Sequence, residues 1–125
     1  MSKRLVTGGL PRSERLRRPG EFRAVFQDRR RTERPSLVVL WRLNDDPRRI
    51  GFAVSRQVRG AVRRNRARRR LREAYRRSRQ ALPSRVQLVC VAREPAVREP
   101  FGVLLREMRS AFRAVGRCEK GAHEP

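Results

Sequence analysis

The chain is short of the residues that most often carry enzymatic chemistry. Its 125 residues include one histidine and 12 acidic residues, and the histidine, His123, lies near the end of the sequence. Catalysis by side chains usually needs paired carboxylates, a cysteine–histidine pair or a metal-binding cluster, and no zinc, phosphate-loop or nucleotide-binding motif occurs. Asp45 and Asp46 fit a turn instead. The sequence therefore predicts no catalytic residue, no metal ligand and no cofactor bound by the protein.

Long apolar runs and cysteines are also scarce. No stretch approaches the ~18 apolar residues of a membrane-spanning helix, and the first residues, MSKRLVTGGLP, lack the apolar segment of a secretory signal. The two cysteines, Cys90 and Cys118, are too few for a disulfide framework in a domain of this size. We expect a cytoplasmic protein with reduced thiols and no membrane partner.

Basic residues are abundant, and nearly all of them are arginine. The 34 lysines and arginines give a formal net charge of +22, and only Lys3 and Lys120 are lysine. Such a charge favours a polyanionic partner, either nucleic acid or anionic lipid. Arginine binds phosphate through a planar fork and stacks on bases. A GC-rich genome also favours arginine codons, so the preference for arginine does not by itself indicate a function.

The densest charge lies in residues 56–79, which hold twelve arginines and one acid, Glu73. Apolar residues recur through this stretch at helical spacing and Pro83 follows it, so we predict a helix over residues 61–82. One side of this helix is expected to pack on a sheet and consists of Ala67, Leu71, Ala74, Tyr75, Ser78 and Leu82.

The opposite side of this helix predicts a binding surface. Arg66 and Arg68 flank that side, whereas Arg64 lies nearer the apolar side. So many like charges repel one another unless a polyanion is bound. A solvated face or a membrane surface would also account for charge, but the apolar side is needed for the core, and Asn65 can read a base or a 2′-OH edge. The outward ridge consists of Asn65, Arg69, Arg72 and Arg76.

The remaining segments predict one α+β domain over residues 16–116, between a flexible arm (1–15) and a flexible tail (117–125). The order is α-β-β-α-β-α, a two-layer α/β sandwich with helices on a small, mostly antiparallel sheet. Helices are expected over 19–29 and 100–115, the second ended by Gly116, strands over 36–43, 50–54 and 86–92, and a charged connection over 30–34.

The first predicted strand is apolar on both faces. Alternation places Leu37, Val39, Trp41 and Leu43 on one face, and Val38 and Leu40 on the other. The strand over 50–54 is expected to be its antiparallel partner.

Residues 49–76, RIGFAVSRQVRGAVRRNRARRRLREAYR, resemble the signature region of the bacterial ribonuclease P protein component. In that family a strand ends in three successive positions: Val, then Ser or Pro, then Arg or Lys. A short loop then leads to Ala-Val-x-Arg-Asn-Arg. Here Val54-Ser55-Arg56 is followed by Ala61-Val62-Arg63-Arg64-Asn65-Arg66. The likeness extends over residues 15–115. It has one departure, Arg59 before Gly60, where the family usually has glycine and then a polar residue.

This resemblance implies both a fold and a function. The fold would contain an unusual left-handed β-α-β crossover. The protein would be the non-catalytic subunit, in a 1:1 complex, of a ribonucleoprotein endoribonuclease that removes the 5′ leader from precursor tRNA. The RNA subunit would carry out the cleavage with Mg²⁺, and the protein would bind this catalytic RNA and the precursor tRNA.

Two sets of site residues follow from the resemblance. The leader would lie in a cleft between the first helix and the sheet, lined by Phe22, Phe26 and Trp41, with Phe112 as a fourth candidate. Aromatic rings over a basic groove suit single strands because every base has a face to stack; core packing is the alternative for all four. The set expected to bind the catalytic RNA is Arg56, Arg59, Arg63, Arg64, Asn65, Arg66, Arg68, Arg69, Arg72 and Arg76.

Two other classes of protein share the charge and the size. A ribosomal or other structural RNA-binding protein is the main alternative, although the aromatic leader-binding residues and the context of the Arg-Asn-Arg motif argue against it. A DNA-compacting protein is the second alternative, and it would show no preference for structured RNA.

Overall fold

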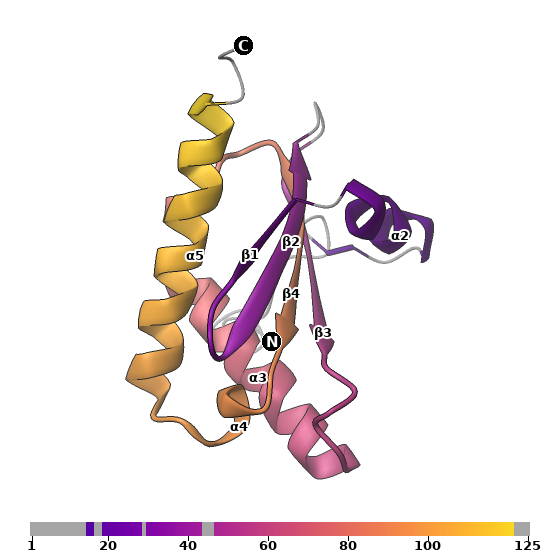
Figure 1. Ribbon diagram of the computed structural model, residues 1–125, viewed down its shortest axis with the longest axis vertical. Coiled ribbons are helices and arrows are strands. Elements are labelled where there is room, and N and C mark those ends of the chain that lie inside the picture. Colours follow the sequence, from indigo (N-terminus) through magenta and orange to yellow (C-terminus); the bar gives the residue numbers. More distant parts are fainter. Residues whose placement is uncertain (1–14, 17–18, 29, 44–46, 122–125) are drawn as a thin grey trace, which may run out of the picture.

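The computed structural model describes residues 15–16, 19–28, 30–43 and 47–121. The predicted arm, apart from Arg15, and His123 lie outside these residues. Four strands form one sheet, with the two long helices on one side of it and a shorter helix on the other (Figure 1). The elements are α2 (Pro19–Asp28), β1 (Arg30–Glu33), β2 (Leu37–Leu43), β3 (Arg49–Val54), α3 (Ala61–Ser78), the 3₁₀ turn η2 (Arg79–Ala81), β4 (Val86–Ala92), α4 (Pro95–Arg98) and α5 (Phe101–Gly121).

The strand order is β1-β2-β4-β3, so the predicted antiparallel pairing of β3 with β2 is wrong. β4 lies between them, antiparallel to β2 and parallel to β3. β2 and β4 are apolar on both faces and are buried almost throughout, which suits central strands. The more exposed β3 takes the edge. The α+β class is confirmed.

The connection from β3 through α3 to β4 is the left-handed crossover that the resemblance implied. In Figure 1 both strands point downwards, β4 lies to the left of β3, and α3 passes behind the sheet. Nearly all connections between parallel strands are right-handed. The hand of this crossover therefore sets the fold apart from ordinary β-α-β proteins.

The sheet separates two apolar clusters. The larger cluster lies under α3 and α5 and includes Leu37, Val39 and Trp41 of β2. The smaller one lies under α2 and includes Val38 and Leu40. The predicted alternation along β2 is therefore confirmed.

The stretch expected as a charged connection forms the edge strand β1, so that prediction is wrong. β1 pairs antiparallel with β2, with Arg30 opposite Trp41 and Glu33 opposite Val38. Edge strands tolerate charged side chains because one side of the strand faces solvent. Charge alone therefore does not identify this segment as a loop.

The helices differ from those expected in three respects. α3 ends at Ser78 and continues as η2 to Ala81, two residues before Pro83. The short α4 was not predicted. α5 continues through Gly116 to Gly121, so the predicted end of this helix at Gly116 is wrong.

Candidate nucleic-acid interface

The outer face of α3 carries the predicted ridge. Asn65, Arg69, Arg72 and Arg76 are exposed, and the opposite side of the helix is buried against the sheet and α5. The buried residues are Ala67, Leu71, Ala74, Tyr75 and Ser78, so the assignment of the two faces is confirmed.

Arg64 points to the inner side and holds the loop that precedes the helix. Its Nη1 donates hydrogen bonds to the carbonyls of Ser55 (2.9 Å) and Val58 (3.0 Å), and its Nη2 donates to the carbonyl of Val54 (3.2 Å). These bonds tie the end of β3 to the first turn of α3. The guanidinium group of Arg64 thus has a structural task.

The departure from the family signature lies in this same loop. Gly60 adopts a φ of 92°, a backbone conformation that disfavours residues with a Cβ atom. Arg59 beside it is exposed, as is Arg56 at the start of the loop. The loop therefore presents two cations next to the first turn of α3.

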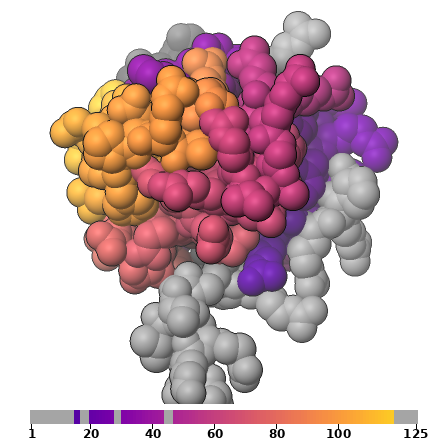
Figure 2. Space-filling model, turned by 90° about the horizontal axis from the view of Figure 1, so that it is seen from below, coloured from indigo at the N-terminus to yellow at the C-terminus, as the bar shows by residue number. Residues whose placement is uncertain are grey.

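A second group of arginines attaches α3 to α4 and the segment after it. Arg63 forms an ion pair with Glu94, Arg66 Nε donates to the carbonyl of Val97 (3.1 Å), and Arg70 donates to the carbonyl of Glu99. Seen from this end of the molecule, the loop and first turns of α3 lie beside α4 and the start of α5 (Figure 2). The contacts fix the direction in which α3 leaves the sheet.

Glu73, the one acidic residue of α3, pairs with arginines at the C-terminal end of the ridge. Glu73 pairs with Arg76 (2.6 Å) and with Arg77 (2.9 Å). The hydrogen bond from Arg76 is the main cause that lowers the pKa of the Glu73 carboxyl below its usual value. Arg76 therefore presents only part of its hydrogen-bonding capacity outwards, whereas Arg69 has no partner among the described residues.

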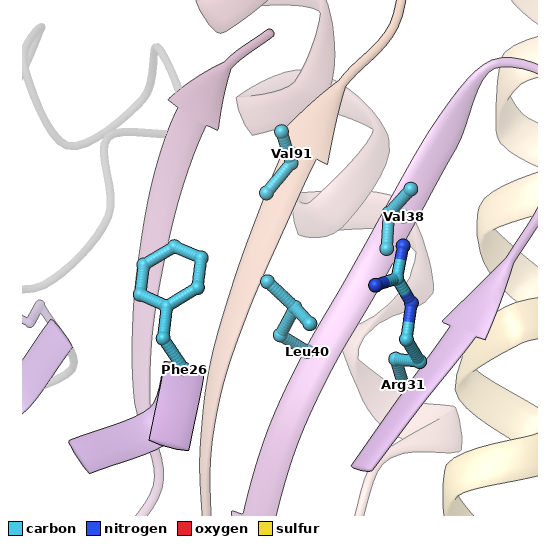
Figure 3. A pocket seen from close by; sticks show the side chains of 5 residues that line it. All are labelled: Phe26, Arg31, Val38, Leu40 and Val91. Carbon is cyan, nitrogen blue, oxygen red and sulfur yellow. The ribbon is translucent and has the colours of Figure 1, made fainter. Parts of the chain in front are cut away.

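A groove lies on the other side of the sheet, beside α2. It has a volume of about 540 Å³ and is lined by Phe26, Arg31, Val38, Leu40 and Val91 (Figure 3). Phe26 is 46% exposed, which is unusual for a large apolar residue. The groove thus combines an apolar floor, an accessible aromatic ring and a cation.

The four predicted aromatic residues do not share this groove, and the prediction of one common cleft is corrected. The Phe22 ring lies over Gly51 of β3 and packs against the smaller apolar cluster. Trp41 is 3% exposed and Phe112 is fully buried, both in the cluster on the α3 and α5 side. Neither offers a ring face to a ligand. The alternation along β2 already placed Trp41 away from the α2 side.

The sequence reasoning missed Arg31 and the floor of the groove. Arg31 lies in the segment predicted as a charged connection, but in the structure it stands in a strand opposite Leu40 and lines the groove. The place of Val38 and Leu40 in the groove could have been predicted, because alternation along the strand puts them on the face opposite Trp41. For Val91 the sequence predicts a strand but no site.

Other kinds of site find little support. No group of three histidine, cysteine or acidic residues within the described ranges could hold a metal ion. Cys90 is buried, and burial raises the pKa of its thiol, so it is not a reactive nucleophile. None of the helices in the described part of the chain is long and apolar enough to cross a membrane.

The fold and the charged face define a class: a small α+β domain with a left-handed crossover that displays an arginine-rich helix. The model of the Ribonuclease P family matches residues 10–116. The chain belongs to the ribonuclease P protein component family.

Individual relatives agree with this assignment. The chain is 42% identical over 120 residues to the Ribonuclease P protein component of Methylococcus capsulatus, covering 94% of this chain and 92% of that one. It is 40% identical over 108 residues to that of Gluconacetobacter diazotrophicus, covering 84% and 93%. The solved RNase P protein of Thermotoga maritima superimposes with a TM-score of 0.71 at 27% identity, covering 81% of this chain and 96% of that structure.

Proposed function

We propose that this protein is the RNA-binding subunit of a ribonuclease P ribonucleoprotein that removes 5′ leaders from precursor tRNA. The exposed ridge of α3 supports this proposal most directly, because it places several cations on one face with the amide of Asn65 among them. Arginines bind phosphates through forked hydrogen bonds, and an amide can distinguish a 2′-OH or a base edge. The ridge is suited to a structured RNA.

In this proposal the catalytic RNA binds the ridge of α3 and the loop before it, in a 1:1 complex in the cytoplasm. Arg56, Arg59 and Arg69 supply exposed cations, whereas Arg64 and Arg66 chiefly position the helix. The RNA, with Mg²⁺, carries out the hydrolysis. The protein contributes affinity and orientation, because its sequence holds a single histidine and few acids.

The most direct test is cleavage of precursor tRNA by the cognate catalytic RNA with and without this protein. The protein should accelerate cleavage most at low Mg²⁺, because its cations replace part of the charge neutralisation that Mg²⁺ provides to the packed RNA. If 5′ processing is unchanged at every Mg²⁺ concentration, the proposed function is wrong.

The groove beside α2 is proposed to hold the single-stranded leader. Its exposed Phe26 ring offers a stacking surface and Arg31 offers a phosphate contact, from two different elements (Figure 3). Stacking of bases on aromatic rings tolerates any sequence, as a leader-binding site requires.

Phe26→Ala should therefore weaken binding of precursor tRNA by about 1 kcal/mol or more, the usual loss for one base–aromatic stack. Binding of mature tRNA, which lacks the leader, should change little. The measurement is the ratio of the two dissociation constants for the holoenzyme. Trp41→Phe is the control, because Trp41 is buried on the other side of the sheet and should leave the ratio unchanged. Equal losses for both tRNAs in Phe26→Ala would refute the leader site.

A further inference from the structure

The charge of α3 is unevenly distributed along its length. Residues 63–72 contain seven arginines and no acidic residue, whereas the next residue is Glu73, the one acid between residues 56 and 79. A carboxylate on a helix that binds RNA has a cost, because it repels the phosphates of any RNA that approaches. A stabilising pair along the helix is one role that could offset this repulsion, and control over which RNA binds is another.

Glu73 uses both carboxylate oxygens on the arginines that follow it. Arg76 donates from Nε to Oε1 (3.2 Å) and from Nη2 to Oε2 (2.6 Å), and Arg77 donates from Nε to Oε2 (2.9 Å). Arg69, one turn before Glu73, has no partner among the described residues. An acid that precedes its basic partner by three or four residues is the favoured orientation on a helix. The order of the residues therefore directs Glu73 to the C-terminal end of α3 (residues 73–78) and leaves Arg69 free.

The C-terminal end of α3 is accessible, yet its cations are already paired. The side chains of Glu73, Arg76 and Arg77 are 34%, 43% and 50% exposed. The Arg77 guanidinium also lies over the Phe101 ring, 5.4 Å from its centroid. Exposed ion pairs along a helix add little to stability, so stabilisation alone accounts poorly for this acid. Its larger effect is on binding, because RNA phosphates must compete with a carboxylate for the two arginines.

We propose that Glu73 is a specificity-determining residue, which weakens binding of unrelated RNA by occupying Arg76 and Arg77. Unrelated RNA binds through charge alone and gains from every free cation that it reaches. The catalytic RNA, oriented by Asn65 and Arg69, depends less on the C-terminal end of the helix. Specificity is a difference of two affinities, and a repulsive group increases it by weakening the wrong complex. The preference for the catalytic RNA rests on the proposed function, whereas the effect on unrelated RNA does not.

The first experiment measures the affinity of the full chain for an unrelated RNA duplex as a function of salt. Glu73→Gln should bind the duplex roughly two- to fivefold more tightly, and the slope of log affinity against log salt should steepen by about 0.7–0.9, because a freed arginine neutralises one more phosphate. Glu99→Gln is the matched control. It removes the same charge, and the Glu99 carboxylate pairs with no arginine of the described residues.

A second set of variants tests whether the effect passes through the paired arginines. In the background Arg76→Gln/Arg77→Gln, Glu73→Gln should no longer tighten binding of the duplex, because the cations that Glu73 occupies are absent. The proposal is refuted if Glu73→Gln gains no more affinity than Glu99→Gln, since net charge alone would then explain the result. It is also refuted if the gain persists without Arg76 and Arg77.

The last measurement repeats the titration with the catalytic RNA. Glu73→Gln should change this affinity by less than about twofold, so that the ratio of the two affinities falls. An equal gain for both RNAs would show that Glu73 limits affinity and not specificity, and a loss for the catalytic RNA would show that Glu73 orients its arginines for that RNA; either result overturns the proposal. If the wild-type chain does not prefer the catalytic RNA to the duplex, the proposed function fails, whereas the result for Glu73 on the duplex stands by itself.

Discussion

At the scale of single residues, the arginines of residues 56–79 divide into two groups with different tasks. Arg64, Arg66 and Arg70 donate to backbone carbonyls of the loop, α4 and the segment after it, whereas Arg69 projects outwards without a partner in the described structure. The helical periodicity of the sequence anticipated this for Arg64 but not for the other two, because α4 was not predicted. The role of a long side chain that bonds to a neighbouring element cannot be predicted when that element itself is not predicted.

Arg64→Ala should lower the free energy of unfolding by about 1–3 kcal/mol, because it leaves the carbonyls of Val54 and Val58 without their hydrogen-bond donor. Arg69→Ala is the control and should have an effect within about 0.5 kcal/mol, as for other exposed substitutions. Denaturant unfolding of both variants checks the prediction. If the two variants were equally stable, Arg64 would not be a structural residue.

At the scale of elements, the strands were easier to predict than their partners. The apolar pattern of β2 and β4 identified two strands with both faces covered, yet nothing in residues 30–54 revealed that β4 would separate β2 from β3. Strand pairing depends on contacts between distant segments, and a parallel pair joined by a helix leaves no local turn signal. For the same reason β1 was missed, since its pairing with β2 outweighs its charged composition.

A polar cluster fastens the β1–β2 turn to α5. The buried Ser36 donates from its backbone amide (3.0 Å) and its hydroxyl (2.5 Å) to one oxygen of Glu107, and Arg34 donates to Ser110 (3.0 and 3.1 Å). Arg93 adds an ion pair with Glu33 (2.8 Å). These contacts hold the turn on the helix that covers the main core.

Glu107→Ala should cost about 1–3 kcal/mol of folding stability, because the amide and hydroxyl of Ser36 are buried and would lose their acceptor. Glu107→Gln keeps an acceptor oxygen and should cost clearly less. Thermal or denaturant unfolding of the pair measures the difference. Equal losses of stability in the two variants would show that the charge of Glu107, and not its hydrogen bonds to Ser36, stabilises the fold.

At the scale of the whole molecule, charge is distributed unevenly over the fold. The exposed ridge of α3 lies on one side of the sheet and the groove beside α2 on the other. The sequence predicted the ridge because helical periodicity is a local property. The groove depends on how α2 and β1 meet the sheet, which no local pattern encodes.

The central claim is that the ridge of α3 binds the catalytic RNA through specific contacts and not through net charge alone. The measurement is the affinity of the full chain for that RNA as a function of salt, for the double variant Asn65→Ala/Arg69→Ala and for the control Arg113→Ala. Arg113 is exposed on α5, and both changes remove one positive charge.

The double variant should bind at least about tenfold more weakly, or about 1.4 kcal/mol, and the slope of log affinity against log salt should fall by about 0.7–0.9. Arg113→Ala should bind almost as well as the wild-type chain. Equal losses of affinity in the two variants, or no loss in the double variant at physiological salt, would contradict the assignment of α3 as the RNA-binding surface.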